Sequence, residues 1–109
     1  MKVWNQWNEE AVKDGVGKLY NEVGIVSLTK NKFSEGGYEK CSYDMIQKYG
    51  AKVERLEGAG TAGKKFPAWE KGGNKYIDGY FNSVAGWANP NLTLNWLARK
   101  AVTKGVTFV

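Results

Sequence analysis

The sequence predicts an α+β fold in which amphipathic helices alternate with short strands. Apolar side chains recur at helical spacing in three segments. Runs rich in β-branched and aromatic residues lie between or beside them, bounded by glycines. The length of 109 residues allows one domain and no more, with a core of modest size.

The first segment, residues 3–13, is predicted to be helical because its apolar side chains form one stripe. The stripe consists of Trp4, Trp7, Ala11 and Val12. Gly15 and Gly17 follow and are typical of a helix end. Residues 19–30 (LYNEVGIVSLTK) are rich in apolar and β-branched side chains, so we expect a single strand there.

A second helix is predicted over residues 38–49, ending before a left-handed glycine cap at Gly50. Its apolar side chains at helical spacing are Tyr38, Cys41, Met45, Ile46 and Tyr49. Because Cys41 belongs to this stripe, we interpret it as a small core residue and not as a nucleophile.

The middle of the chain is predicted to contain two strands separated by a loop. Residues 51–57 alternate as a short strand does, and residues 58–74 are rich in glycine and lysine with Pro67 among them, which indicates a loop. Residues 75–82 predict a strand that places Tyr76, Asp78 and Tyr80 on one face.

The last helix has the clearest signals of the chain. Asn89 is a good N-cap, Pro90 suits the first helical position, and Gly105 ends the helix. The predicted core-facing stripe consists of Leu94, Leu97, Ala98, Ala101 and Val102. Residues 106–109 (VTFV) then predict the start of a strand. A helix followed by an apolar strand is half of a parallel crossover unit, and the chain offers few partner strands for it.

The charge of the chain is positive but dispersed. The formal net charge is +5 and the pI is about 9.3, yet the 16 basic residues never form a block of five. The segment closest to a nucleic-acid-binding pattern is 63–76. One alternative is therefore a small basic module that binds an anionic partner, either nucleic acid or a nucleotide phosphate. Its residues would be Lys64, Lys65, Lys71, Lys75, Trp69 and Tyr76.

Residues 58–65 (GAGTAGKK) spell G-x-G-x-x-G, the pattern of a phosphate-binding turn. That motif requires a strand before it and a helix after it. A strand is plausible before it, but Pro67 argues against a helix after it. Lys65 also occupies the position at which a P-loop has a Ser or Thr for magnesium. Asp78 could be mistaken for the ribose-binding acid of such a fold. We therefore interpret the segment as a flexible loop.

The residue inventory excludes several kinds of site. There is no histidine, and the single cysteine, Cys41, cannot form an intramolecular disulfide. No apolar run is long enough to span a bilayer, and the N-terminus has no signal-peptide pattern. We expect no metal, no membrane and an intracellular location, cytoplasmic or peroxisomal, and we expect nucleic acid as a partner only if the basic-module alternative holds.

Residues 78–89 (DGYFNSVAGWAN), followed by a helix and by residues 104–109 (KGVTFV), carry a resemblance to a known family. They resemble the FAD-dependent amine oxidases of the sarcosine oxidase, fructosyl-amino-acid oxidase (amadoriase) and saccharopine oxidase group. The remainder is similar in order but more weakly, through residues 48–58 (KYGAKVERLEG) and Phe66-Pro67. The segment GAGTAGKK departs from the family, which has a more polar and helical stretch there.

The resemblance implies that this chain is an internal segment of a two-domain flavoenzyme. Residues 1–88 would belong to a substrate domain built on an antiparallel sheet. Residues 89–109 would be the helix and strand that lead back into a Rossmann-type FAD domain. The seam between these domains would involve Tyr80, Asn82, Gly86 and Trp87. Gly86 would permit a tight backbone approach, and Trp87 would pack in the seam or, equally well, in a core.

The activity that the resemblance implies is oxidation of a C–N bond. The flavin takes a hydride from the carbon beside a secondary amine or N-substituted amino acid, the imine hydrolyses, and O2 reoxidises the flavin to give H2O2. The family's FAD fingerprint and flavin-linking cysteine lie outside the matched region. We therefore assign no catalytic residue, and we expect FAD only in the parent enzyme and this chain alone to be inactive.

Overall fold

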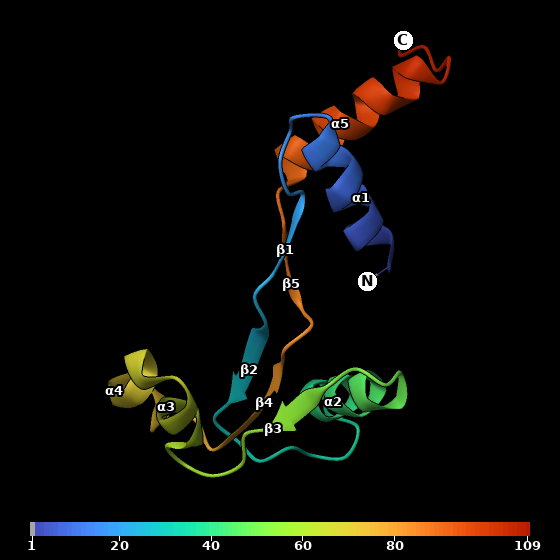
Figure 1. The fold of residues 1–109 in the computed structure, drawn as a ribbon. Coiled ribbons are helices and arrows are strands. Elements are labelled where there is room, and N and C mark those ends of the chain that lie inside the picture. The colour runs from blue at the N-terminus through green and yellow to red at the C-terminus, as the bar shows by residue number, and fades with distance from the viewer. Residues whose placement is uncertain (1) are drawn as a thin grey trace. The chain divides into compact units, whose positions relative to one another are not determined.

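The computed structural model describes residues 2–109 and confirms an α+β fold with small antiparallel sheets (Figure 1). The chain forms two compact units. Unit 1 combines the residues up to Glu22 with Gly86–Val109, and unit 2 is Val23–Ala85. Every strand pairing among the described residues is antiparallel.

Unit 1 consists of two helices and a two-stranded sheet. The helices are α1 (Lys2–Lys13) and α5 (Pro90–Thr103), and the strands are β1 (Tyr20–Glu22) and β5 (Gly86–Ala88). Ala11, Leu19 and Trp96 form its buried core. Trp96 therefore joins the C-terminal helix to residues of the first helix and of the segment before β1.

The side chain of Asn8 ties α1 to the beginning of β1. Its Oδ1 accepts hydrogen bonds from the N–H groups of Leu19 (2.8 Å) and Tyr20 (2.9 Å), and its Nδ2 donates to the Tyr20 carbonyl (2.8 Å). On α5, the Trp96 indole N–H donates to Asp14 (2.8 Å), and Lys100 pairs with Glu10 (3.1 Å). Unit 1 is thus held by a small apolar core with polar links around it.

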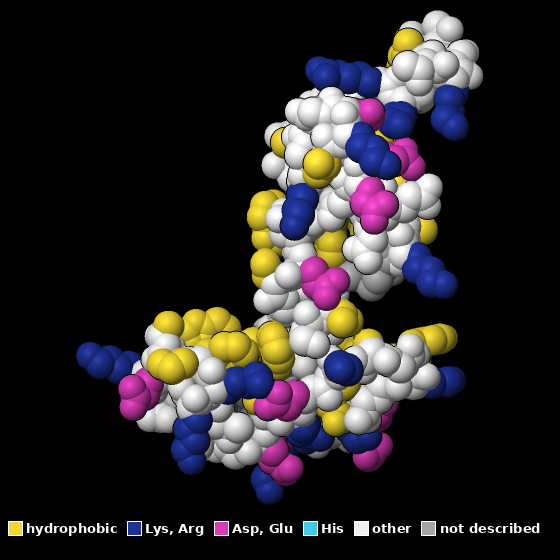
Figure 2. All heavy atoms as spheres, in the orientation of Figure 1, with side chains coloured by type: hydrophobic (Ala, Val, Ile, Leu, Met, Phe, Trp, Pro, Cys, Tyr) yellow, Lys and Arg dark blue, Asp and Glu magenta, His cyan; other side chains and the backbone are white. Residues whose placement is uncertain are grey.

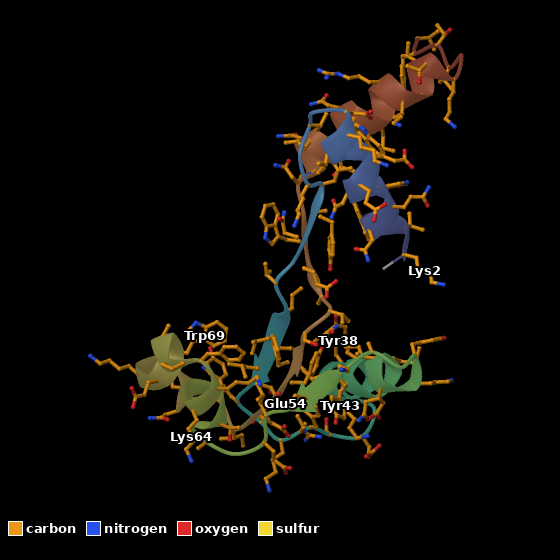
Figure 3. All side chains as sticks on the ribbon, viewed as in Figure 1. Lys2, Tyr38, Tyr43, Glu54, Lys64 and Trp69 are labelled. Atoms are coloured by element: carbon orange, nitrogen blue, oxygen red, sulfur yellow. The ribbon has the colours of Figure 1, made fainter. Side chains whose placement is uncertain are left out.

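Unit 2 has a three-stranded sheet in the order β2–β4–β3 with helices on both faces (Figure 1). Its elements are β2 (Ile25–Thr29), α2 (Tyr38–Lys48), β3 (Val53–Arg55), α3 (Thr61–Lys65), the 3₁₀ helix η1 (Pro67–Trp69), α4 (Glu70–Gly73) and β4 (Asp78–Asn82). Tyr43 of α2 packs on Tyr80 of β4, with ring centroids 6.0 Å apart. Phe66, between α3 and η1, packs on Phe81 at 5.3 Å. Because successive strand residues point to opposite faces, α2 covers one side of the sheet and η1 the other (Figure 3).

The strand predicted for residues 19–30 is divided into β1 and β2. Gly24 lies between them with φ +79°, and a Cβ at this position would lie 2.4 Å from the Phe81 ring. The left-handed backbone at Gly24 ends the first strand before the second begins. The two halves of the predicted strand belong to different units.

The helix predicted over residues 38–49 is confirmed, but the orientation expected for it is wrong. The side chains that meet the sheet include Tyr43, and no residue of α2 is fully buried. Cys41 is exposed, as are Tyr38 (80%) and Tyr49 (76%), so Cys41 is not a core residue. The aromatic contacts of Tyr43 decided which side of the helix faces the sheet.

The interval 58–74 is not the loop that its composition indicated. It forms α3, η1 and α4, which are all short. Gly63 and Gly73 allow this compact arrangement, because a Cβ on Gly63 would lie 2.9 Å from the Glu70 Cα and one on Gly73 would lie 3.1 Å from the Gly63 nitrogen. Pro67 stands at the first position of η1, where the absence of its N–H has no cost.

The last helix begins and ends as predicted, but of its predicted apolar stripe only Leu97 packs against the core of unit 1. Asn89 caps α5 by accepting from the Leu92 N–H (3.1 Å), and Gly105 follows with φ +87°. The buried residues of α5 are instead Thr93 and Trp96. Leu94 is 66% exposed and Val102 is 57% exposed.

The strand predicted for residues 106–109 is absent from the structure. The Val106 N–H closes the helix end by donating to the Ala101 carbonyl (3.0 Å), and Phe108 is 62% exposed. No strand of the described chain pairs with this segment. An isolated extended segment has no ladder of hydrogen bonds to hold it.

Candidate functional site

The four residues predicted at a domain seam are divided between the two units. Tyr80 and Asn82 belong to β4 in unit 2, whereas Gly86 and Trp87 belong to β5 in unit 1. Tyr80 is buried against the rings of Phe33 and Tyr43, with centroids 6.4 and 6.0 Å away. The Asn82 side chain accepts from the Val84 N–H (3.2 Å). Both side chains therefore have structural contacts within unit 2.

Gly86 makes a close backbone approach to the neighbouring strand β1 of the same unit, and the approach expected of it at a domain crossing stays a prediction. A Cβ at this position would lie 2.0 Å from the Asn21 carbonyl oxygen. Trp87, by contrast, is 54% exposed, so the interpretation of this ring as a core residue is wrong. Its role in a seam stays a prediction.

An apolar surface is left uncovered on α5 of unit 1. It surrounds an open hollow lined by Leu94, Asn95, Leu97, Ala98, Ala101 and Phe108. Leu94, Leu97, Ala98 and Ala101 belong to the stripe that the sequence predicted for a core, and of these Leu97 also packs against the core around Trp96. We call these six residues the α5 face.

Asp78 is a structural acid and is not available to a ligand. Its side chain is fully buried and holds Arg55 through two hydrogen bonds of 2.6 and 2.7 Å. It also accepts from the N–H groups of Phe33 (2.8 Å) and Gly79 (2.9 Å). Burial alone would raise the pKa of Asp78, but the hydrogen bonds from Arg55 and from these N–H groups outweigh it and hold the pKa below its ordinary value.

Arg55 completes the pair from within an aromatic enclosure. Its guanidinium carbon lies 3.9 Å from the centroid of the Phe33 ring and 5.5 Å from that of Tyr43. A planar guanidinium stacks well on such rings, so the cation is compensated by both Asp78 and the ring faces. This cluster stabilises the α2 side of the sheet.

The G-x-G-x-x-G segment forms a compact turn that leads into the short helix α3. A helix does follow it, contrary to expectation, but α3 has only 5 residues. The N–H groups of Thr61 and Lys64 donate to the Gly58 and Gly60 carbonyls, and the Thr61 hydroxyl donates to Glu57. These donors are used within the turn, so Thr61 and Lys64 do not offer them to the pyrophosphate of a dinucleotide.

The residues of the basic-module alternative separate into two sets. Lys65 is paired with Glu54, and Lys64 and Lys71 are exposed on the short helices. Lys75, Trp69 and Tyr76 come together around one groove of unit 2, which is lined also by Val26, Leu28, Ala68, Gly72 and Gly73. The structure thus selects three of the six predicted residues.

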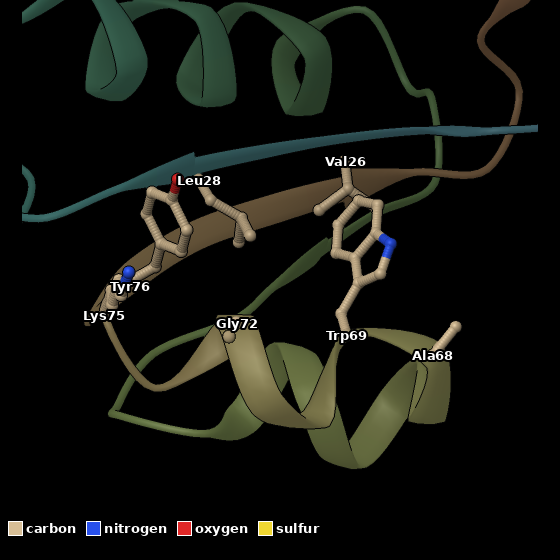
Figure 4. A pocket seen from close by; sticks show the side chains of 8 residues that line it. Val26, Leu28, Ala68, Trp69, Gly72, Lys75 and Tyr76 are labelled. Carbon is tan, nitrogen blue, oxygen red and sulfur yellow. The ribbon is translucent and has the colours of Figure 1, made fainter.

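This groove, called here the β2–α4 groove, has a volume of about 480 Å³. Val26 and Leu28 of the edge strand β2 form one wall, and α4 forms the other at Gly72 (Figure 4). The rings of Trp69 and Tyr76 stand at its two ends (Figure 4). Hydrophobic side chains gather on this part of the surface (Figure 2). The alternation of Val26 and Leu28 along β2 could have indicated the first wall of the groove. The opposite wall is formed by a helix in a segment whose composition had indicated a loop.

Two further properties of the described residues concern metal-ligand groups and membrane-spanning helices. No group of three or more Cys, Asp or Glu side chains in residues 2–109 could hold a metal ion. Of the helices formed by these residues, none has the length and apolarity to cross a membrane.

Comparison of the chain with protein-family models, with curated proteins and with solved structures finds no significant match.

Proposed function

We propose that this chain is a segment of a FAD-dependent amine oxidase, in which α5 leads from the substrate domain to a Rossmann-type FAD domain. The observation that carries the proposal is the α5 face. Helix α5 already buries Trp96 and packs Leu97 within unit 1, yet Leu94, Ala98 and Ala101 line an open apolar hollow on another side of the helix. A stripe of this length on a helix normally packs against another element.

The resemblance of residues 78–89 supports the identity of the missing element. In the family, this stretch leads into a helix of the FAD domain, and here it leads into α5. The close approach at Gly86 and the exposed ring of Trp87 suit a chain that passes from one packed layer to another. In the family, the FAD fingerprint and the flavin-linking cysteine lie outside the matched region, so FAD would be held by segments outside this chain.

The test uses the full-length protein of which this chain is proposed to be a segment. We expect an in-frame G-x-G-x-x-G after a strand upstream of Met1, and a purified product with flavin absorbance near 450 nm that releases H2O2 from sarcosine, a fructosyl amino acid or saccharopine. The 109-residue chain is the matched control, and it should retain no FAD. A colourless full-length product without the fingerprint would refute the proposal.

A basic binding module is the second candidate, and the clustering of Lys75, Trp69 and Tyr76 favours it. Binding to an extended polyanion should weaken steeply with salt, in proportion to the number of phosphates contacted. A titration of the chain with single-stranded DNA at about 50 and 200 mM salt tests this. Binding that is absent or insensitive to salt would exclude nucleic acid as the partner.

A further inference from the structure

We propose that the β2–α4 groove binds a planar aromatic molecule that carries one carboxylate. The proposal does not rest on the α5 face, because every residue that lines the groove belongs to unit 2, whereas α5 belongs to unit 1. Three properties of the groove lead to this ligand: its shape, the rings at its ends and its single charge.

The shape of the groove suits a flat molecule. Leu28 and Val26 lie above α4, and the helix presents Gly72 toward them with no side chain (Figure 4). A Cβ on Gly72 would meet no atom within 4 Å, so the space above this glycine is open. The volume of about 480 Å³ is within the usual range for small-molecule sites.

The rings at the two ends of the groove provide aromatic contact surfaces. Trp69 is 44% exposed, and its ring packs on Phe66 with centroids 5.7 Å apart. Phe66 in turn packs on Phe81 in the sheet. Trp69 is thus supported from behind while part of its surface remains accessible. Together with Tyr76, it offers the edge and face contacts that aromatic ligands prefer.

The charge of the groove comes from one residue. Lys75 is the only charged side chain in the lining, and the described chain gives it no ion-pair partner. Lys65 on the neighbouring helix is, by contrast, already neutralised by Glu54. One uncompensated ammonium beside an apolar slot matches a ligand with one negative charge and an apolar body.

A nucleotide shares the planar ring and the negative charge but fits the groove less well. Its phosphate is a dianion near neutral pH, and phosphate sites commonly gather several donors, often backbone N–H groups at a helix N-terminus. The groove supplies Lys75 as its one charged side chain, and the N–H groups of Thr61 and Lys64 in the nearby glycine-rich turn are bonded within that turn. The geometry therefore points to the carboxylate.

The experiment measures binding of 2-naphthoate to the full chain by ¹H–¹⁵N NMR. We expect shifts of the Trp69 indole N–H and of the amides of residues 72–76. The uncharged 2-naphthamide should bind about fivefold more weakly, because it lacks the contact with Lys75. Adenosine 5′-monophosphate is titrated in parallel. If it binds more tightly than 2-naphthoate, the assignment to a carboxylate is overturned.

Two substitutions locate the ligand and its charge. Lys75→Gln should reduce affinity for 2-naphthoate about fivefold and leave 2-naphthamide unchanged. Lys71→Gln, which removes an equal charge outside the lining, is the matched control and should change neither. Gly72→Leu should fill the slot and weaken both ligands at least about tenfold. An unperturbed spectrum elsewhere shows that each variant folds.

Equal weakening by Lys75→Gln and Lys71→Gln would mean that the ligand senses only the net charge of the surface. Undiminished binding to a folded Gly72→Leu variant would mean that the ligand lies elsewhere. Either result overturns the proposal.

Discussion

At the scale of single residues, the ion pair between Asp78 and Arg55 is the contact on which unit 2 depends most directly. We predict that Asp78→Asn destabilises unit 2 by about 2–3 kcal/mol, because it leaves a cation without its buried partner. The cost falls at the lower end for buried pairs since the Arg55 side chain is 28% exposed. Hydrogen exchange of the Leu56 amide, which donates to the Gly79 carbonyl, measures the loss.

The matched control is Glu35→Gln, because Glu35 is 91% exposed and its nearest contact with Lys40 is 3.8 Å. We expect a change below about 0.5 kcal/mol there. Equal effects of the two substitutions would show that the buried pair of Asp78 and Arg55 contributes no more to stability than the exposed Glu35 does.

The same carboxylate makes the stability of unit 2 dependent on pH. Because the folded pKa of Asp78 lies below the ordinary value of 3.8, its contribution is complete above about pH 3.8 and is lost as pH falls through the lower folded pKa. We predict that the difference in stability between wild type and Asp78→Asn shrinks over that acidic interval. Hydrogen exchange or urea unfolding at pH 6 and pH 2.5 checks it, and a constant difference would contradict it.

At the scale of the elements, we predict that replacing glycine by alanine has opposite effects on stability at two positions. Gly86→Ala should separate β1 from β5, because its Cβ would lie 2.0 Å from the Asn21 oxygen, and we expect a loss of about 2 kcal/mol or more. Gly72→Ala should stabilise α4 by up to about 1 kcal/mol, since its Cβ meets nothing and alanine favours helix. Thermal unfolding of the two variants compares them, and a neutral Gly86→Ala would contradict the register.

The start of α5 provides another prediction at this scale. Asn89→Ala should cost about 1 kcal/mol, because the Leu92 N–H loses its capping acceptor. Asn91→Ala, an exposed position within the first turn, is the control and should be neutral or slightly stabilising. Urea unfolding followed by helical circular dichroism distinguishes them. Equal effects would mean that the cap contributes nothing.

At the scale of the whole molecule, a substitution on the α5 face should affect the stability of the chain and of the proposed parent enzyme differently. Leu94→Gln should change the stability of the chain by less than about 0.5 kcal/mol, because Leu94 is 66% exposed. In the parent enzyme it should cost about 1.5–3 kcal/mol of stability and accelerate FAD loss, if another element covers this side chain. Arg99→Gln is the control on the same helix. An unaffected parent enzyme would contradict the proposed packing.

The ends of α5 and the two faces of β4 could be predicted because local chemistry specifies them. An Asn-Pro pair with a later glycine marks both ends of a helix whatever surrounds it, and alternation assigned Asp78 and Tyr80 to one face of β4. The β2–α4 groove could not be predicted. Its helical wall depends on the contact of Gly63 with α4, and such contacts between residues apart in sequence leave no local signal.

The sequence by itself determined the α+β class and the ends of the three longer helices, α1, α2 and α5, because capping, glycine conformation and periodicity act within a few residues. Only the tertiary structure decided which side of each helix is buried. Helices α2 and α5 both carry apolar residues on more than one side, and the contacts of Tyr43 and Trp96 selected the inner one. When a helix has more than one apolar side, the buried side is the one that meets the rest of the fold. The position of that contacting surface depends on residues distant in the sequence.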